Sequence, residues 1–215
     1  MKSTFLTIAF AAFATMVAPQ AQGSTSYALT VDNCTGSCGT SPFGTINLQQ
    51  LNSTDVQVTV TLFDGNKFAN SAGEALAFNI DPAVGAIAVP TITAGYSLGS
   101  GGFSKNPLGT FSNFIHCDAC GSGGSNPQPG PLVFTVRATG LLEASFITAD
   151  PEGNLGAFYF VSDIISGTTG NTGNVAAPGG TVETHAVTPE PVSMSLVGAG
   201  LLAIGLWKRK NRRTA

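Results

Sequence analysis

The feature that most constrains the fold of this chain is a strict alternation of side chains over residues 54–63. Every second residue from Val56 to Leu62 is apolar, and the residues between them are glutamine or threonine. A period of two places the apolar side chains on one face of a β-strand and the polar ones on the other. Asp64-Gly65-Asn66 follows, and Asp-Gly supplies the positive φ that a tight reversal needs. The stretch therefore predicts a half-buried strand that ends in a hairpin turn.

Shorter segments of the same kind follow along the chain. They are separated by turns rich in Gly, Pro and Asn, and no long helical period interrupts them. This pattern predicts an all-β fold, an antiparallel β-sandwich of jelly-roll-like form, with an immunoglobulin-like sandwich as the alternative. The expected strands are 27–31, 44–51, 54–63, 75–80, 86–92, 110–116, 132–137, 144–148 and 155–165.

Both ends of the chain look like targeting segments and not like parts of the sandwich. At the N-terminus, Met1-Lys2 is followed by an apolar run over 5–18 and by small residues at Ala21 and Gly23. This arrangement predicts a signal peptide helix that is removed before Ser24.

Near the C-terminus, the run from Val192 to Trp207 contains no charged residue. As a helix it would span roughly 24 Å, which approaches the thickness of a bilayer's hydrocarbon core. Basic residues follow it and should stay on the cytoplasmic side, so we expect a transmembrane helix with the rest of the chain facing outward. The basic tail consists of Lys208, Arg209, Lys210, Arg212 and Arg213.

The C-terminal segment resembles the PEP-CTERM sorting signal of Gram-negative bacteria. The resemblance rests on three parts in order: the motif Pro189-Glu190-Pro191, a short Gly-rich apolar helix and a terminal basic cluster. It implies a transient inner-membrane anchor that exosortase cuts near the motif, followed by delivery to the cell surface or extracellular matrix. The alternative is an ordinary single-pass anchor that is never removed, and both readings place the body outside the cytoplasm.

These segments predict a four-part organisation. The parts are a signal peptide (1–23), a β-sandwich domain (24–165), an extended spacer rich in Gly, Thr, Asn and Pro (166–188) and the sorting signal (189–215).

The body is also similar to a group of uncharacterised PEP-CTERM proteins. The matching stretches are an early cysteine pair at 34–38, the alternating strand and turn at 54–65, a Cys-x-x-Cys loop at 115–121 and a Phe-rich strand at 158–164. This looser resemblance implies no activity.

Charge is distributed unevenly between the body and the tail. All twelve acidic residues lie between Asp32 and Glu190, whereas of the nine basic residues only Lys67, Lys105 and Arg137 lie there. Binding of nucleic acid requires clustered basic side chains, so we expect no nucleic-acid partner.

Four cysteines form two close pairs, Cys34/Cys38 and Cys117/Cys120. Disulfides are the default in an exported chain, and four cysteines allow three connectivities. We favour the two local pairs, because each lies in a Gly-rich loop that can bend tightly. A four-cysteine zinc site, with His116 beside it, and a thioredoxin-type Cys-x-x-Cys are the alternatives; the latter is disfavoured because the Gly-rich run after Cys120 is a poor helix start.

Catalytic signals are weak, and we expect no enzyme. The chain has no Gly-x-Ser-x-Gly elbow, and His116 is its one plausible catalytic histidine. Glycosidase chemistry would need two carboxylates across a cleft, and the sequence nominates no pair. The carboxylates available are Asp64, Asp118, Glu143, Asp150 and Asp163.

Cofactor signals are weak as well, and we expect no cofactor and no metal ligands. Calcium has some support from the oxygen-rich turn at 150–154, although this turn matches no calcium-loop pattern. The Gly-rich loop at 99–102 lacks the Lys-Ser/Thr of a phosphate-binding loop.

The sequence therefore predicts an exported, non-catalytic protein of the cell surface or extracellular matrix, with exosortase and the inner membrane as its transient partners. The alternative is a module that binds extracellular polysaccharide. That reading predicts a row of exposed aromatic side chains for sugar stacking. Because Trp207 lies in the membrane segment, Tyr27, Tyr96 and Tyr159 would have to supply this row.

Overall fold

A computed structural model of the chain describes residues 24–71, 73–99, 101–149, 155–179 and 183–185. All of them lie in one of the two units into which the chain divides, Gln22–Val187. The signal peptide, the apolar run and the basic tail predicted from the sequence lie outside the described residues.

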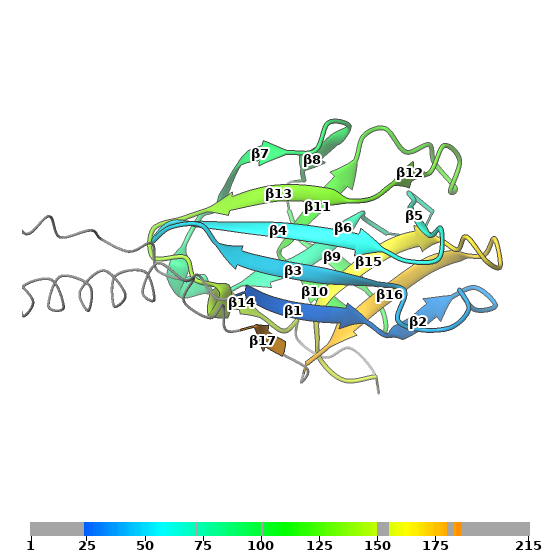
Figure 1. Cartoon of the computed structure of the whole chain (residues 1–215), viewed down its shortest axis with the longest axis horizontal. Coiled ribbons are helices and arrows are strands. Elements are labelled where there is room, and N and C mark those ends of the chain that lie inside the picture. Colours follow the sequence, from blue (N-terminus) through cyan, green and yellow to red (C-terminus); the bar gives the residue numbers. More distant parts are fainter. Residues whose placement is uncertain (1–23, 72, 100, 150–154, 180–182, 186–215) are drawn as a thin grey trace, which may run out of the picture. The chain divides into compact units, whose positions relative to one another are not determined.

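Six antiparallel strands form the first sheet, in the order β17-β1-β3-β4-β13-β7 (Figure 1). The pairing of β3 with β4 and of β4 with β13 runs without a bulge, and these strands form the middle of the sheet. The bounds are β1 Ser24–Leu29, β3 Gly44–Gln50, β4 Asp55–Leu62, β7 Ala88–Ile92, β13 Leu132–Arg137 and β17 Glu183–His185.

The second sheet is also antiparallel and lies behind the first in Figure 1. Its centre is β15, which pairs with β16 on one side and with both β5 and β6 on the other. The bounds are β2 Val31–Cys34, β5 Lys67–Phe68, β6 Leu76–Ile80, β8 Tyr96–Leu98, β11 Asn113–Cys117, β12 Gln128–Pro129, β14 Phe146–Ile147, β15 Phe158–Ile165 and β16 Thr172–Pro178. Two short 3-10 helices, Pro82–Val84 and Glu143–Ser145, lie in the connecting loops.

The main core lies between the two sheets. Alternate residues of β4, including Val56, Val58 and Val60, are fully buried and belong to the same apolar cluster as Phe160 and Ile164 of β15. The outward residues Gln57, Thr59 and Thr61 of β4 remain at least partly exposed. The predicted antiparallel, sandwich-like all-β fold is therefore confirmed, and its cause is the period-two alternation.

A second apolar cluster covers the outer face of the second sheet. The hairpin of β9 (Phe103–Lys105) and β10 (Gly109–Phe111) supplies Leu108 and Phe111 to this cluster, against Val161 of β15 and Ala176 of β16. The sequence predicted a single strand over 110–116. Instead, the chain breaks at Ser112, so that Phe111 packs on the outer face while Ile115 of β11 packs in the main core.

The spacer predicted for 166–188 is wrong over residues 172–178. These residues form β16, which pairs with both β15 and β2, and five of them in succession are buried. The strand was missed because its residues are small and show no apolar alternation. Ala176 and Ala177 are instead buried on opposite faces of the sheet, one in each apolar cluster. The folded body therefore extends well beyond residue 165.

Candidate functional site

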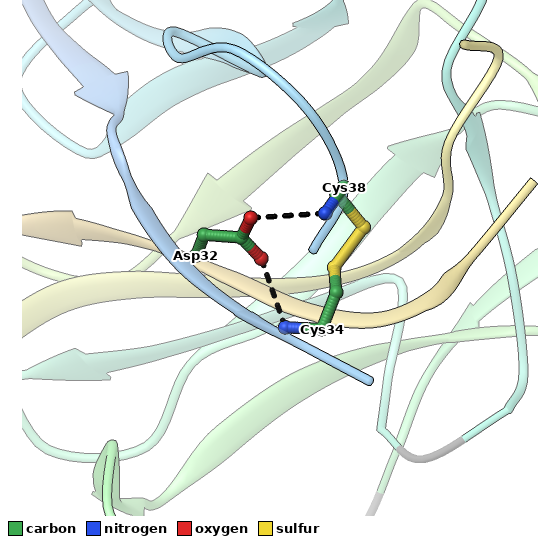
Figure 2. Close-up of side chains that lie close together, drawn as sticks. All are labelled: Asp32, Cys34 and Cys38. Carbon is green, nitrogen blue, oxygen red and sulfur yellow. Dashed lines mark hydrogen bonds between the residues drawn. A yellow bond between two sulfur atoms is a disulfide. The ribbon is translucent and has the colours of Figure 1, made fainter. Parts of the chain in front are cut away.

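The first disulfide, Cys34–Cys38, closes a loop directly after β2, with 5.7 Å between the two Cα atoms. Figure 2 shows Asp32 facing this disulfide. Its carboxylate accepts hydrogen bonds from the backbone N–H groups of Cys34 and Cys38, both at 2.9 Å, and from Ser37 Oγ at 2.7 Å. Partial burial raises the pKa of Asp32, but these three hydrogen bonds outweigh it and lower the pKa overall. An ionised Asp32 therefore holds the loop in shape.

The same loop is bonded to a loop far along the chain. Ser166 Oγ donates to the carbonyl of Cys38 at 2.8 Å, and Asn171 Nδ2 and Thr169 Oγ1 donate to the carbonyl of Ser37 at 2.8 and 3.0 Å. The Cys34–Cys38 loop thus fixes the connection between β15 and β16.

The second disulfide, Cys117–Cys120, closes the loop after β11, with 5.3 Å between the Cα atoms. The loop is bonded on both sides: Ala119 N–H donates to the Gly95 carbonyl, and Asn126 Nδ2 donates to the Ala119 carbonyl. Residues after Cys120 continue as turns and do not form the helix that a thioredoxin-type motif requires.

Both favoured local disulfides are therefore present, and the described residues contain no free cysteine. A four-cysteine zinc site needs thiolates, so the zinc hypothesis is wrong for this oxidised state. Asp32, Cys34 and Cys38 do bring possible ligand atoms within 4.8 Å of one another. The two sulfurs are bonded to each other, however, and the carboxylate is already occupied by three donors.

His116 lies on β11. Its Nδ1 is 2.7 Å from Glu74 Oε2, and among the described residues its ring has no other hydrogen-bond partner. Ser97, directly across the strand pair from His116, donates instead to Asp118 at 2.8 Å. The histidine and its neighbours therefore form two separate polar pairs and not a serine–histidine relay.

Asp163 is fully buried on β15. Its carboxylate accepts hydrogen bonds from Ser71 N, Ser71 Oγ and Gly73 N, at 2.6, 2.8 and 3.1 Å. These residues belong to the loop between β5 and β6. Asp163 therefore fixes the connection between these two strands, which pair with the same side of β15. A single aspartate within the apolar run of 158–165 was the sequence signal for this role.

The other candidate carboxylates are also engaged in holding the fold or lie on the surface. Glu143 accepts from Thr25 Oγ1 at 2.6 Å and from Gln50 N at 2.8 Å. Asp64 lies in the turn after β4, with a positive φ of 53°. The chain crosses there to β5 of the second sheet, which pairs with β12 and β15 and not with β4, so the hairpin predicted at this turn is wrong. Asp150 lies outside the described residues. No two of these groups face each other across a cleft in the described part of the chain.

Two open pockets, of about 400 and 310 Å³, are lined by neutral side chains apart from Lys67. The larger lies between the β9–β10 hairpin and the end of β6, and includes Asn79 and Thr148. Neither contains His116 or a carboxylate.

The tyrosines do not form a sugar-binding row. Tyr27 and Tyr96 are 4% and 7% exposed, and burial raises the pKa of each to about 12, with smaller effects of Tyr159 and Glu143 on Tyr27. Tyr159 is half-buried and packs on Tyr27, with ring centroids 4.8 Å apart. The predicted aromatic platform is therefore wrong for these residues.

The outer face of the first sheet carries a feature whose extent the sequence analysis missed. On this face, three of the cross-strand pairs between β3 and β4 consist entirely of polar, uncharged side chains. We call this set the β3–β4 polar ladder; its pairs are Thr45/Thr61, Asn47/Thr59 and Gln49/Gln57. The alternation on 54–63 predicted half of it, but the partner strand has a less regular pattern.

The sorting motif Pro189-Glu190-Pro191, the basic tail and the oxygen-rich turn at 150–154 lie outside the described residues. Within the described ranges, no helix is long and apolar enough to cross a membrane.

Comparisons with known proteins give no relative: no family model, no curated protein and no solved structure matches this chain.

Proposed function

We propose that this chain is an exported, non-catalytic protein of the cell surface or extracellular matrix, sorted by a PEP-CTERM signal and released from its inner-membrane anchor by exosortase. The observation that carries this proposal is that both cysteine pairs are closed as disulfides. Disulfides persist in oxidising compartments and are rare in the cytosol. The proposal thus joins the chemistry of the body to the targeting signals of the two ends.

The position of the folded body supports the same proposal. Ser24, the residue expected to follow signal-peptide removal, is already paired with His185 of β17. The motif Pro189-Glu190-Pro191 follows only a few residues later in the sequence. The described body therefore lies in the sequence between the two predicted targeting segments.

The finer fold assignment, jelly-roll-like, is also part of our proposal. It is supported by repeated crossing of the chain between the two sheets: β1 lies in the first, β2 in the second, β3 and β4 in the first, and β5 and β6 in the second. Such crossings are typical of Greek-key and jelly-roll sandwiches.

Labelling of intact cells tests the location. A membrane-impermeant amine reagent should modify Lys67, which is exposed, without cell lysis. Labelling of Lys67 only after lysis would place the body inside the cell and overturn the proposal.

A further inference from the structure

We propose that the β3–β4 polar ladder binds an uncharged polysaccharide, a partner that rests on the proposed export because such chains surround the cell. Among the described residues, no other element packs on this face: Gln49 and Thr61 are exposed, and the other four ladder residues are partly exposed. The outer face of the second sheet, by contrast, is covered by the β9–β10 hairpin. The two faces of the sandwich are thus unequal.

The ladder holds hydrogen-bonding groups in a regular array. Strands lie about 4.8 Å apart and alternate residues about 6.8 Å apart along a strand, so three pairs extend over roughly 14 Å. Asn47 Nδ2 donates to Ser26 Oγ at 3.0 Å. The side chains of the remaining five residues form no hydrogen bond within the described part of the chain, so their amide and hydroxyl groups are available. Paired donors and acceptors at fixed spacing suit the neighbouring hydroxyls of a sugar chain.

Charge selects among possible partners. The ladder itself is neutral, and at its end Asp55 is neutralised by Arg137, whose Nε and an Nη nitrogen donate to the carboxylate at 2.6 and 2.8 Å. An anionic polysaccharide or nucleic acid would find no cluster of basic side chains here and would meet an acidic body. A neutral glycan meets no such repulsion.

A second copy of the chain fits this face less well than a glycan does. The centres of protein–protein interfaces are enriched in apolar and aromatic side chains, whereas the ladder has none. Its apolar neighbours on the same face include Ala28 of β1, opposite Thr45, and Val133 of β13, opposite Thr59. Hydrogen bonding without aromatic stacking also implies weak binding by a single body, which many copies on a surface would reinforce.

The test is a binding assay on the exported protein purified from its host. Cellulose, a β-1,3-glucan and dextran serve as neutral probes, and alginate serves as the anionic comparator. We expect the parent protein to bind at least one neutral probe. The double variant Gln49→Ala/Gln57→Ala should raise the dissociation constant about tenfold or more, because each lost hydrogen bond contributes of the order of threefold to tenfold in affinity. Gln128→Ala is the matched control, since it truncates an amide on β12, outside the ladder; it should bind like the parent. Thermal melting checks that each variant is folded, and Thr45→Ala/Thr61→Ala provides a second ladder variant.

Three results would overturn the inference: no binding to any neutral probe, binding that the ladder variants leave unchanged, or binding to alginate alone. If Lys67 is labelled on intact cells but no neutral polysaccharide binds, the polysaccharide partner is ruled out and the proposed export still holds. Lys67 protected on intact cells would instead remove the proposed function itself.

Discussion

At the scale of single residues, aspartates stabilise the loops of this molecule. Asp32 holds the Cys34–Cys38 loop, Asp163 holds the loop between β5 and β6, and Asp55 is bonded to Arg137 across β4 and β13. Each carboxylate accepts several hydrogen bonds, as buried or partly buried polar groups generally do. These three acidic residues therefore have a structural role.

Acid should weaken the fold through Asp55. The hydrogen bonds from Arg137, then those from Asn52, hold the pKa of Asp55 well below its usual range. In the unfolded chain, the carboxyl of Asp55 takes up a proton at a higher pH, near 4. The stabilising effect of the ionised carboxylate is therefore present above that pH and is lost as the pH falls toward the pKa of the folded state. We expect the difference in unfolding free energy between the parent and Asp55→Asn to shrink over this window, measured by denaturant unfolding at several pH values. A difference independent of pH would show that the charge of the Asp55 carboxylate does not contribute to stability through its contact with Arg137.

Gly73 should tolerate no larger residue. A Cβ at this position would overlap Asn174 Oδ1, a buried atom that has no hydrogen-bond partner among the described residues, and would crowd Asp163. We expect Gly73→Ala to destabilise the protein by about 1–3 kcal/mol, the usual cost of overpacking. Gly102→Ala is the control, because a Cβ there makes only an ordinary contact with the Phe111 carbonyl. Equal melting temperatures for the two variants would contradict the tight packing described here.

At the scale of elements, the sequence predicted the strands whose periodicity is strong. The structure confirms β13 over the expected 132–137 and β4 within 54–63. Asp64 and Gly65 adopt the expected positive φ, but the turn leads to β5 of the second sheet and closes no hairpin. The structure differs from the prediction in segments whose sequence has no clear period. β16 is built from small residues, and the β9–β10 hairpin is short and preceded by glycines, so burial of these segments depends on neighbours that no local pattern reveals.

The candidate site was predictable only in part, for the same physical reason. The two local disulfides follow from short spacing in flexible loops, and the outward threonines of β4 follow from alternation. The hydrogen-bond partners of Asp32 and Asp163 could not be predicted from the sequence, because they depend on which loops the fold brings together. The burial of Tyr27 and Tyr96 likewise depends on strand register across two sheets.

Removal of the Cys34–Cys38 disulfide should loosen one end of the sandwich and spare its core. For a loop this short, the chain-entropy model gives a loss of about 2 kcal/mol for Cys34→Ser/Cys38→Ser. Because Ser37 and Cys38 accept hydrogen bonds from the loop at 166–171, amide hydrogen exchange should accelerate in both loops together. Unchanged exchange at 166–171, with faster exchange at 35–38, would mean that the disulfide does not fix the distant loop.

At the scale of the whole molecule, the described body is a sandwich with one covered and one open outer face. The hairpin covers the second sheet, the polar ladder lies open on the first, and the first and last described strands are neighbours. Under the proposed export, the ladder would present a neutral, hydrogen-bonding surface to the surroundings of the cell.

The most direct test of the central claim is the intact mass of the protein recovered from its native host, measured before and after reduction and alkylation. We predict a chain that begins at Ser24, ends near Pro189–Pro191 and gains alkyl groups at its four cysteines only after reduction. A mass that includes the segment from Met1 or runs through Ala215, with all four cysteines open to alkylation before reduction, would contradict export and sorting.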